Sequence, residues 1–95
     1  MKVRVQYLGF IKNMLNKQED HFEVEEGTPL FELLNKLAGI HGAPFRNEVY
    51  EPGVKKIKTG FSVTINGRFI GQLGGLDAKL SDGDTVIIMS LMTGG

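Results

Sequence analysis

The chain has 95 residues, with 11 basic side chains, 11 acidic side chains and no cysteine. This length allows one hydrophobic core, so we expect a single domain over residues 1–95. The balanced charge gives no net field toward nucleic acid or a membrane surface, and we expect neither partner. Without cysteine there is no disulfide framework, no thiolate metal ligand and no thiol nucleophile, so any sulfur chemistry takes its sulfur from another molecule.

The first residues alternate between polar and apolar side chains. Residues 2–7 place Val3, Val5 and Tyr7 on one side of an extended chain, which is typical of a half-buried strand. The same stretch lacks the apolar segment and the cleavage site of a secretion signal. We therefore expect a first strand and a cytoplasmic protein.

A hairpin is predicted next. Residues 8–17 mix glycine and asparagine with apolar residues and predict a loop with one irregular turn. Residues 20–25 alternate again and place Phe22 and Val24 inward. Together with the first strand, they predict an antiparallel pair joined by a loop longer than the common two residues.

A helix is predicted over about residues 29–38. Thr28 is suited to cap its N-terminus with a side-chain hydrogen bond, and Pro29 is suited to its first position. Gly39 and Gly42 are both placed to end it. The apolar residues recur at helical spacing and form a stripe that must face a core: Leu30, Leu33, Leu34, Leu37 and Ala38.

The pattern is weakest over residues 41–59, which predict a long connection with a possible helical turn at 45–50. The basic cluster inside it, Lys55, Lys56 and Lys58, is interpreted as a solvated guard of a sheet edge. Residues 61–65 then alternate and are rich in strand-forming side chains. Asn66 and Gly67 follow, and this pair is the strongest short signal for a hairpin turn.

The last strand is preceded by residues 82–84, Asp-Gly-Asp, whose residue types are typical of a turn. A cation site is the alternative, but two carboxylates without the other ligands of a calcium-binding loop favour the turn. Residues 86–89 are all apolar, so both faces of this strand carry apolar side chains. The strand is therefore buried on both faces or keeps one face for a partner. Such a strand should lie centrally, beside the first strand. The expected fold is therefore α+β, a ubiquitin-like β-grasp: a mixed sheet of about four to five strands with one main helix on one face.

Two glycines, Gly94 and Gly95, close the chain. Because glycine lacks Cβ, such a segment can enter a narrow channel in any backbone conformation. We expect residues 92–95 to form a flexible tail whose functional group is the carboxylate of Gly95. Apolar side chains beside an exposed tail are costly to leave bare, so partner binding is predicted for Met89, Leu91, Met92 and Thr93.

Three motifs, in this order, resemble the MoaD and ThiS family of ubiquitin-like sulfur carriers: residues 63–68 (Val-Thr-Ile-Asn-Gly-Arg), residues 80–86 (Leu-Ser-Asp-Gly-Asp-Thr-Val) and the final Gly-Gly. The resemblance spans the whole chain and implies a carrier rather than an enzyme. A partner of the ubiquitin-activating type would use ATP to adenylate the carboxylate of Gly95, and a sulfur donor would convert it to a thiocarboxylate. The chain itself would bind no cofactor. A second implied partner is a sulfur-transfer protein or a large synthase subunit. The function expected from the resemblance is that this chain donates its sulfur as the small subunit of a molybdopterin synthase-like system.

Other functions stay open. Members of the family that serve molybdopterin synthesis commonly carry proline just before the diglycine, whereas residues 89–93 have none, so the sulfur acceptor is not assigned. The same diglycine would suit a modifier joined to lysine, and a β-grasp binding module with an incidental tail is the third alternative. An independent catalyst is disfavoured, because no triad spacing or metal set is found and His21 and His41 are interpreted as solvent-exposed.

Overall fold

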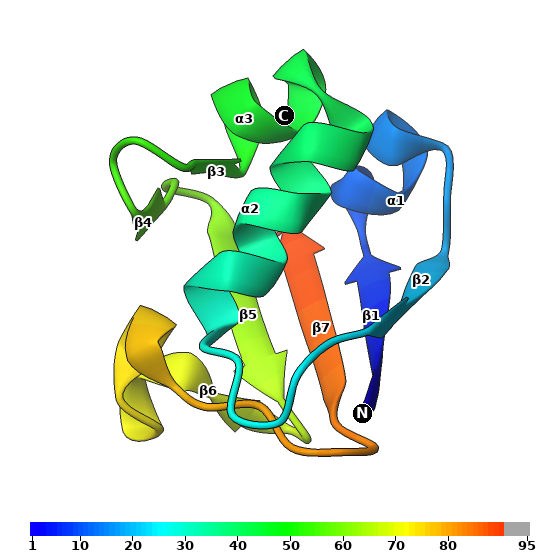
Figure 1. Ribbon diagram of the computed structural model, residues 1–95. Coiled ribbons are helices and arrows are strands. Elements are labelled where there is room, and N and C mark those ends of the chain that lie inside the picture. Colours follow the sequence, from blue (N-terminus) through cyan, green and yellow to red (C-terminus); the bar gives the residue numbers. More distant parts are fainter. Residues whose placement is uncertain (91–95) are drawn as a thin grey trace.

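The computed structural model describes residues 1–90. Within them, a five-stranded mixed sheet packs against one long helix, α2 (Leu30–His41), as Figure 1 shows. In spatial order the strands are β2 (Glu19–Glu23), β1 (Lys2–Leu8), β7 (Thr85–Ser90), β5 (Phe61–Ile65) and β6 (Arg68–Phe69). The β1–β7 pair is parallel and the other pairs are antiparallel. This confirms the predicted β-grasp, with the last strand beside the first in the middle of the sheet.

The connections carry more structure than the sequence predicted. The expected loop after β1 contains a short helix, α1 (Phe10–Leu15). The weakly patterned connection contains α3 (Ala43–Glu48) and a two-stranded ribbon of β3 (Tyr50–Glu51) and β4 (Lys56–Ile57). Two single 3₁₀ turns, η1 (Ile70–Gln72) and η2 (Gly75–Asp77), follow β6. The connection between α2 and β5 also supplies core residues, because three of its side chains are fully buried: Phe45, Val49 and Tyr50.

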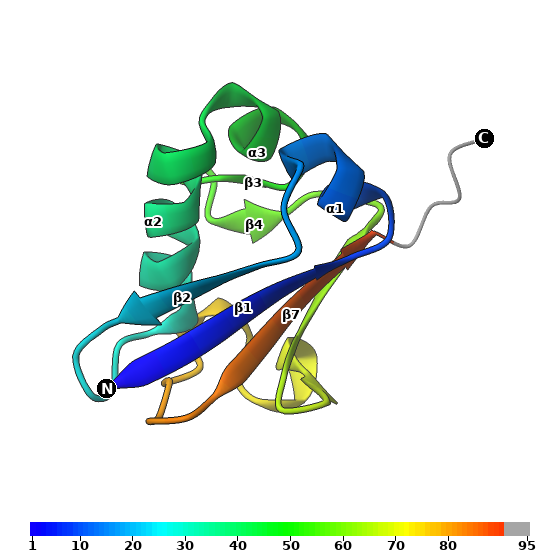
Figure 2. The same cartoon turned by 90° about the vertical axis from the view of Figure 1, so that its right-hand side faces the viewer.

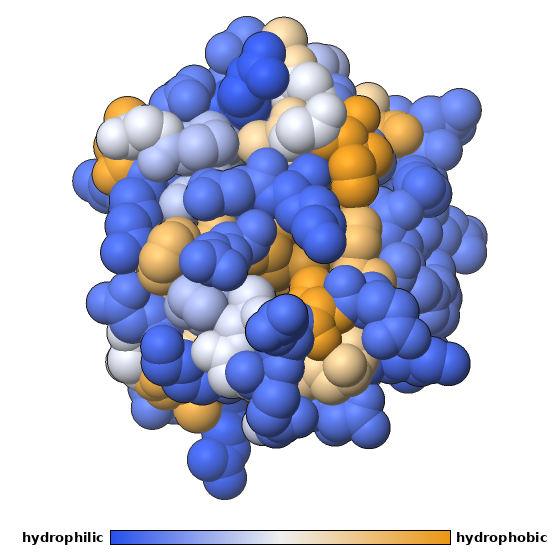
Figure 3. All heavy atoms as spheres, in the orientation of Figure 1, coloured by the Kyte–Doolittle hydropathy of each residue, from blue (hydrophilic) through white to orange (hydrophobic). Residues whose placement is uncertain are grey.

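The core lies between α2 and the inward face of the sheet. The helix buries its predicted stripe of Leu30, Leu33, Leu34, Leu37 and Ala38, and the sheet contributes Val3, Val5, Tyr7, Val63, Ile65, Val86 and Ile88. Burying one leucine side chain contributes about 1.5–3 kcal/mol. Hydrophilic side chains cover most of the molecular face that carries α2 (Figure 3). In residues 1–90, no helix has both the length and the apolar character needed to cross a bilayer.

The start of α2 differs from the prediction. Pro29 occupies the cap position, without a side-chain hydrogen bond to the helix. The Thr28 hydroxyl donates instead to the carbonyl of Glu25, at 2.6 Å. The Thr28 carbonyl accepts a bond from the backbone N–H of Leu80, which holds this segment extended beside the chain that leads to β7. The predicted threonine cap is therefore wrong, because tertiary pairing fixes the residues before the helix.

The end of α2 also lies later than expected. The helix continues through Gly39 and stops before Gly42, whose φ is +74° and whose N–H donates to the Ala38 carbonyl. A positive φ is unfavourable for a side chain with Cβ, so glycine suits this position, where the chain turns into α3. The extra turn brings His41 onto the helix and over the sheet.

Side chains join the hairpin turn after β5 to the turn before β7. Asn66, at φ +53°, donates from Nδ2 to Oδ1 of Asp84 at 2.8 Å. Its Oδ1 accepts the N–H of Thr85 at 2.9 Å, and Asp84 also accepts the N–H of Ser81 at 2.8 Å. The Asp-Gly-Asp segment is a turn, as predicted, and its second carboxylate is used to hold the two turns together.

Two substitutions at Asn66 separate these contributions. Asn66→Gly removes both side-chain hydrogen bonds but tolerates the positive φ, and should lower the free energy of unfolding by about 1–3 kcal/mol. Asn66→Ala adds the cost of a positive φ and should be less stable than Asn66→Gly by about 1 kcal/mol. Urea denaturation of both variants measures the order. An alanine variant at least as stable as the glycine variant would contradict it.

Candidate functional site at the end of the last strand

The candidate site is the end of β7, at Ser90. The predicted site residues Leu91, Met92, Thr93, Gly94 and Gly95 lie outside the described residues, whereas Met89 lies within them. Figure 2 shows that β7 ends beside α1 and the end of β1. On one side Met89 is opposite Leu8 of β1, and on the other side Ser90 is opposite Phe61 of β5. Two strands therefore hold the point from which residues 91–95 continue.

The hydroxyl of Ser90 ties the strand end to α1. The backbone N–H of Phe10 donates to Ser90 Oγ at 2.6 Å, although the two residues are 80 positions apart. The cap residue of α1 is Gly9, which has no side chain to accept a bond, so Ser90 satisfies a free N–H of the first helical turn. Sequence reasoning did not single out Ser90, since a contact over this separation leaves no local pattern.

Partly exposed apolar side chains surround this strand end. The side chains of Val86 and Ile88 point into the core, while Ile87 and Met89 alternate with them and are only half-buried. Beside them, Leu8 is 46% exposed and Phe10 is 54% exposed. We call these four residues, Leu8, Phe10, Ile87 and Met89, the exit surface. The first expectation for β7, burial on both faces, is wrong, because one face is only half-buried. That a partner covers this face, with Met89 in the contact, stays a prediction.

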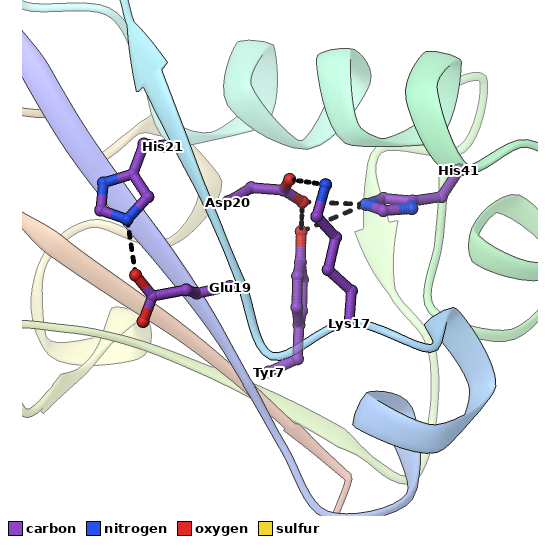
Figure 4. A network of polar contacts seen from close by, with 6 residues as sticks. All are labelled: Tyr7, Lys17, Glu19, Asp20, His21 and His41. Atoms are coloured by element: carbon purple, nitrogen blue, oxygen red, sulfur yellow. Dashed lines mark hydrogen bonds and ion pairs between the residues drawn. The ribbon is translucent and has the colours of Figure 1, made fainter.

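A second group of polar side chains joins β1, β2 and the end of α2 (Figure 4). The Tyr7 hydroxyl donates to Asp20 Oδ2 at 2.6 Å, His41 Nε2 lies 3.0 Å from the same oxygen, and Lys17 pairs with the other carboxylate oxygen. The His41 side chain is 10% exposed, so its expected solvated position is wrong. Its ring also packs near Phe45.

The charges in this network follow from its contacts. Burial alone would raise the pKa of Asp20, but hydrogen bonds from Lys17, Tyr7 and His41 outweigh it and lower the pKa of the carboxyl group. Burial, and then the hydrogen bond to Asp20 and its charge, raise the pKa of the Tyr7 hydroxyl. At neutral pH the network thus holds a carboxylate and a neutral phenol.

We interpret the network as a tie between the β1–β2 pair and α2, because its polar atoms face one another. His21 behaves differently: its side chain is exposed, as predicted, and pairs with Glu19. Across residues 1–90, no three metal-binding side chains gather in a group that could hold a metal ion.

Comparison with known proteins gives one family match. The model of the ThiS family matches residues 5–95. A search of curated proteins gives no match.

Three solved structures illustrate the likeness of fold. The putative molybdopterin converting factor subunit 1 from Pyrococcus furiosus has a TM-score of 0.73 at 24% identity, covering 97% of this chain and 99% of its own. Small archaeal modifier protein 1 from Methanosarcina acetivorans has a TM-score of 0.76 at 21% identity, covering 99% and 96%. A chain of the BexX/CysO complex from Amycolatopsis orientalis has a TM-score of 0.71 at 22% identity, covering 98% and 99%. These likenesses show a ubiquitin-like β-grasp.

The Asp20 network gives a pH-dependent prediction. Asp20→Asn removes the charge that Lys17 and His41 face, and should lower the free energy of unfolding by about 1–3 kcal/mol at neutral pH. Because the folded-state pKa of Asp20 is lowered, its contribution is present above the unfolded pKa of about 3.9 and is lost as the pH falls through the folded pKa. The stability difference between wild type and variant should therefore shrink below about pH 4.

Chemical denaturation over a pH series measures this difference. Glu19→Gln is a suitable control, since Glu19 pairs with an exposed histidine at the surface and its loss should change stability little. A stability difference for Asp20→Asn that does not change with pH would contradict the assignment.

Proposed function

The chain belongs to the ThiS family, and on this premise we propose that it is a sulfur carrier whose Gly95 carboxylate becomes a thiocarboxylate. The observation that carries the proposal is the family match, which extends to residue 95 and so includes both final glycines. The chain has no cysteine, so the sulfur must come from another molecule. In this proposal the protein is a substrate of its partners and not a catalyst.

The first chemical step makes a poor electrophile reactive. A partner activating enzyme directs a carboxylate oxygen of Gly95 to the α-phosphorus of ATP, so that a new P–O bond forms and pyrophosphate leaves. A sulfur nucleophile at the oxidation level of sulfide then attacks the acyl carbon. The C–S bond forms, AMP leaves with the electron pair of the broken C–O bond, and a thiocarboxylate remains. A further partner, a sulfur-transfer protein or a large synthase subunit, accepts this sulfur.

The last residues of this chain allow the Gly95 carboxylate to reach and enter the active site of a partner enzyme. Residues 91–95 can span at most about 16–18 Å from Ser90, at 3.3–3.6 Å per residue. This length allows the carboxylate to enter a buried site while the folded domain stays outside. The two glycines present no Cβ to a narrow channel and accept any φ that the enzyme imposes. Since the reaction consumes ATP, we place the carrier in the cytoplasm.

The exit surface is the proposed contact with the activating enzyme. Leu8 and Phe10 are exposed apolar side chains, and Met89 adjoins Leu8 in the sheet. Covering an apolar patch beside the start of the reacting segment removes apolar surface from water and so lowers the free energy of the complex. This contact would hold the carboxylate near the active site of the enzyme. The predicted partner residues Leu91, Met92 and Thr93 follow directly in the chain and would extend this contact.

A protein modifier is the second candidate function. Its support is the similarity to a structure described as small archaeal modifier protein 1. In this reaction a lysine amine attacks the same activated acyl carbon, an amide bond forms, and AMP leaves. Conjugates that survive reduction, and that disappear when Gly94 and Gly95 are deleted, would favour the modifier. Partner binding that is indifferent to this deletion would instead favour a binding module with an incidental tail.

The carrier proposal predicts a defined product. Incubation of the full chain with an activating enzyme of this class, ATP and sulfide should give a mass gain equal to the replacement of one oxygen by sulfur. Deletion of Gly94 and Gly95 should abolish the product and leave the unfolding transition unchanged, because the deletion leaves the sheet and core formed by residues 1–90 intact. Intact-protein mass spectrometry measures the product. If the chain stays unmodified while the same enzyme preparation is shown to act on its own carrier, the proposal is contradicted.

The exit surface gives a separate prediction. Phe10→Ala and Met89→Ala should each raise the KM for the carrier in adenylation by about 5- to 30-fold, the loss expected for an apolar residue at the centre of an interface. The kcat should stay unchanged, because neither side chain touches the reacting atoms. Val54→Ala is the matched control, since Val54 is 64% exposed in the β3–β4 turn, which lies on the opposite side of α2 from α1 in Figure 1. An equal effect of all three substitutions would argue against this location.

A further inference from the structure

Ser90 is held by α1 on the side where β1 no longer provides a residue opposite it. The parallel register of β1 and β7 ends with Leu8 opposite Met89. From there the chain turns at Gly9 into α1, so Ser90 has no β1 residue opposite it in this register. The hydrogen bond from the Phe10 N–H to Ser90 Oγ, at 2.6 Å, holds the last residue of β7 on that side.

The contact depends on the backbone conformation of Gly9 and on the anchoring of α1 in the core. Gly9 has a φ of +80°, and a Cβ on it would lie 2.6 Å from Ser90 Oγ and 3.3 Å from the Ser90 carbonyl oxygen. Any residue other than glycine would thus be disfavoured by its backbone conformation and by a clash. The next helical residue, Ile11, is fully buried, which anchors α1 and with it the Phe10 N–H. The backbone at residues 9–10 is therefore a firm support for Ser90.

The origin of residues 91–95 is held on two sides, by the pairing of Ser90 with Phe61 of β5 and by this support from α1. If Ser90 left the sheet, the reach of the following segment would grow by about 3.3–3.6 Å, and its possible directions would multiply. Each residue whose backbone is freed and must be ordered again on binding reduces the population of productive placements by about 5- to 30-fold. Holding one residue more in the strand thus raises the chance that the carboxylate meets an active site.

We propose that Ser90 and Gly9 are positioning residues of the carrier reaction. Their contact, which we call the exit clamp (Gly9, the Phe10 N–H and Ser90), fixes the point and direction from which the Gly95 carboxylate approaches the activating enzyme. Neither residue touches the reacting atoms. This inference rests on the proposed function. It adds to that function the residues that direct the Gly95 carboxylate toward the active site of the enzyme.

The test uses the full chain with Ser90→Ala and, from the other side of the contact, Gly9→Ala. Both should raise the KM for the carrier in adenylation by about 5- to 30-fold with kcat unchanged. Ser90→Thr keeps the hydroxyl and should remain close to wild type. The ¹⁵N order parameters of the Met89 and Ser90 amides should fall in both alanine variants, from the rigid value of about 0.85 toward 0.6.

A matched control separates positioning from loss of stability. Ile65→Val trims a buried side chain of β5 that lies opposite Val86, near the start of β7, whereas Ser90 ends that strand. It should destabilise the domain without changing the KM or these order parameters. An equal rise in KM for Ile65→Val would overturn the inference, because the effect would then follow stability alone.

The remaining outcomes distinguish the inference from its premise. If wild type is adenylated and Ser90→Ala has the wild-type KM and order parameters, the exit clamp is overturned while the carrier function stands. If an enzyme active on its own carrier does not adenylate wild type, the proposed function fails and the positioning role fails with it.

Discussion

The parallel pairing of β1 with β7 is the constraint on which the rest of the structure depends. It joins the first and last strands, so α2 must cross the sheet between them and cover one face. In register, Val5 lies beside Val86 and Tyr7 beside Ile88, and all four side chains are buried under the helix. The same pairing brings the turn after β1 to the end of β7, which is where the exit clamp forms.

The pairing also divides β7 into two faces that differ in burial. The inward residues Val86 and Ile88 anchor the strand in the core, while Ile87 and Met89 remain half-buried on the other face. Substitutions at Ile87 or Met89 can therefore test the proposed partner contact while Val86 and Ile88 keep the core filled. The Tyr7–Asp20–His41 network supports this arrangement from the core side, because it fixes the end of α2 to the edge pair β1–β2.

Features with a local physical cause could be predicted from the sequence. The leucine stripe of α2, the turn at Asn66 and the central place of β7 follow from periodicity, from tolerance of positive φ and from apolar residues at both parities. Contacts between distant residues could not be predicted: the role of Ser90, the burial of His41 and the replacement of the Thr28 cap each depend on elements brought together by the fold. In the candidate site, Met89 is found at the strand end, and the diglycine lies outside the described residues.

The order of the strands has a consequence for synthesis of the protein. β7 comes after every other strand in the chain, yet it fills the middle of the sheet. Until residues 85–90 leave the ribosome, the facing edges of β1 and β5 have no partner and the inward apolar side chains have no complete core. Folding is therefore completed only after residues 85–90 have left the ribosome, so a chain cut short before β7 would keep these apolar side chains exposed and would be prone to aggregate.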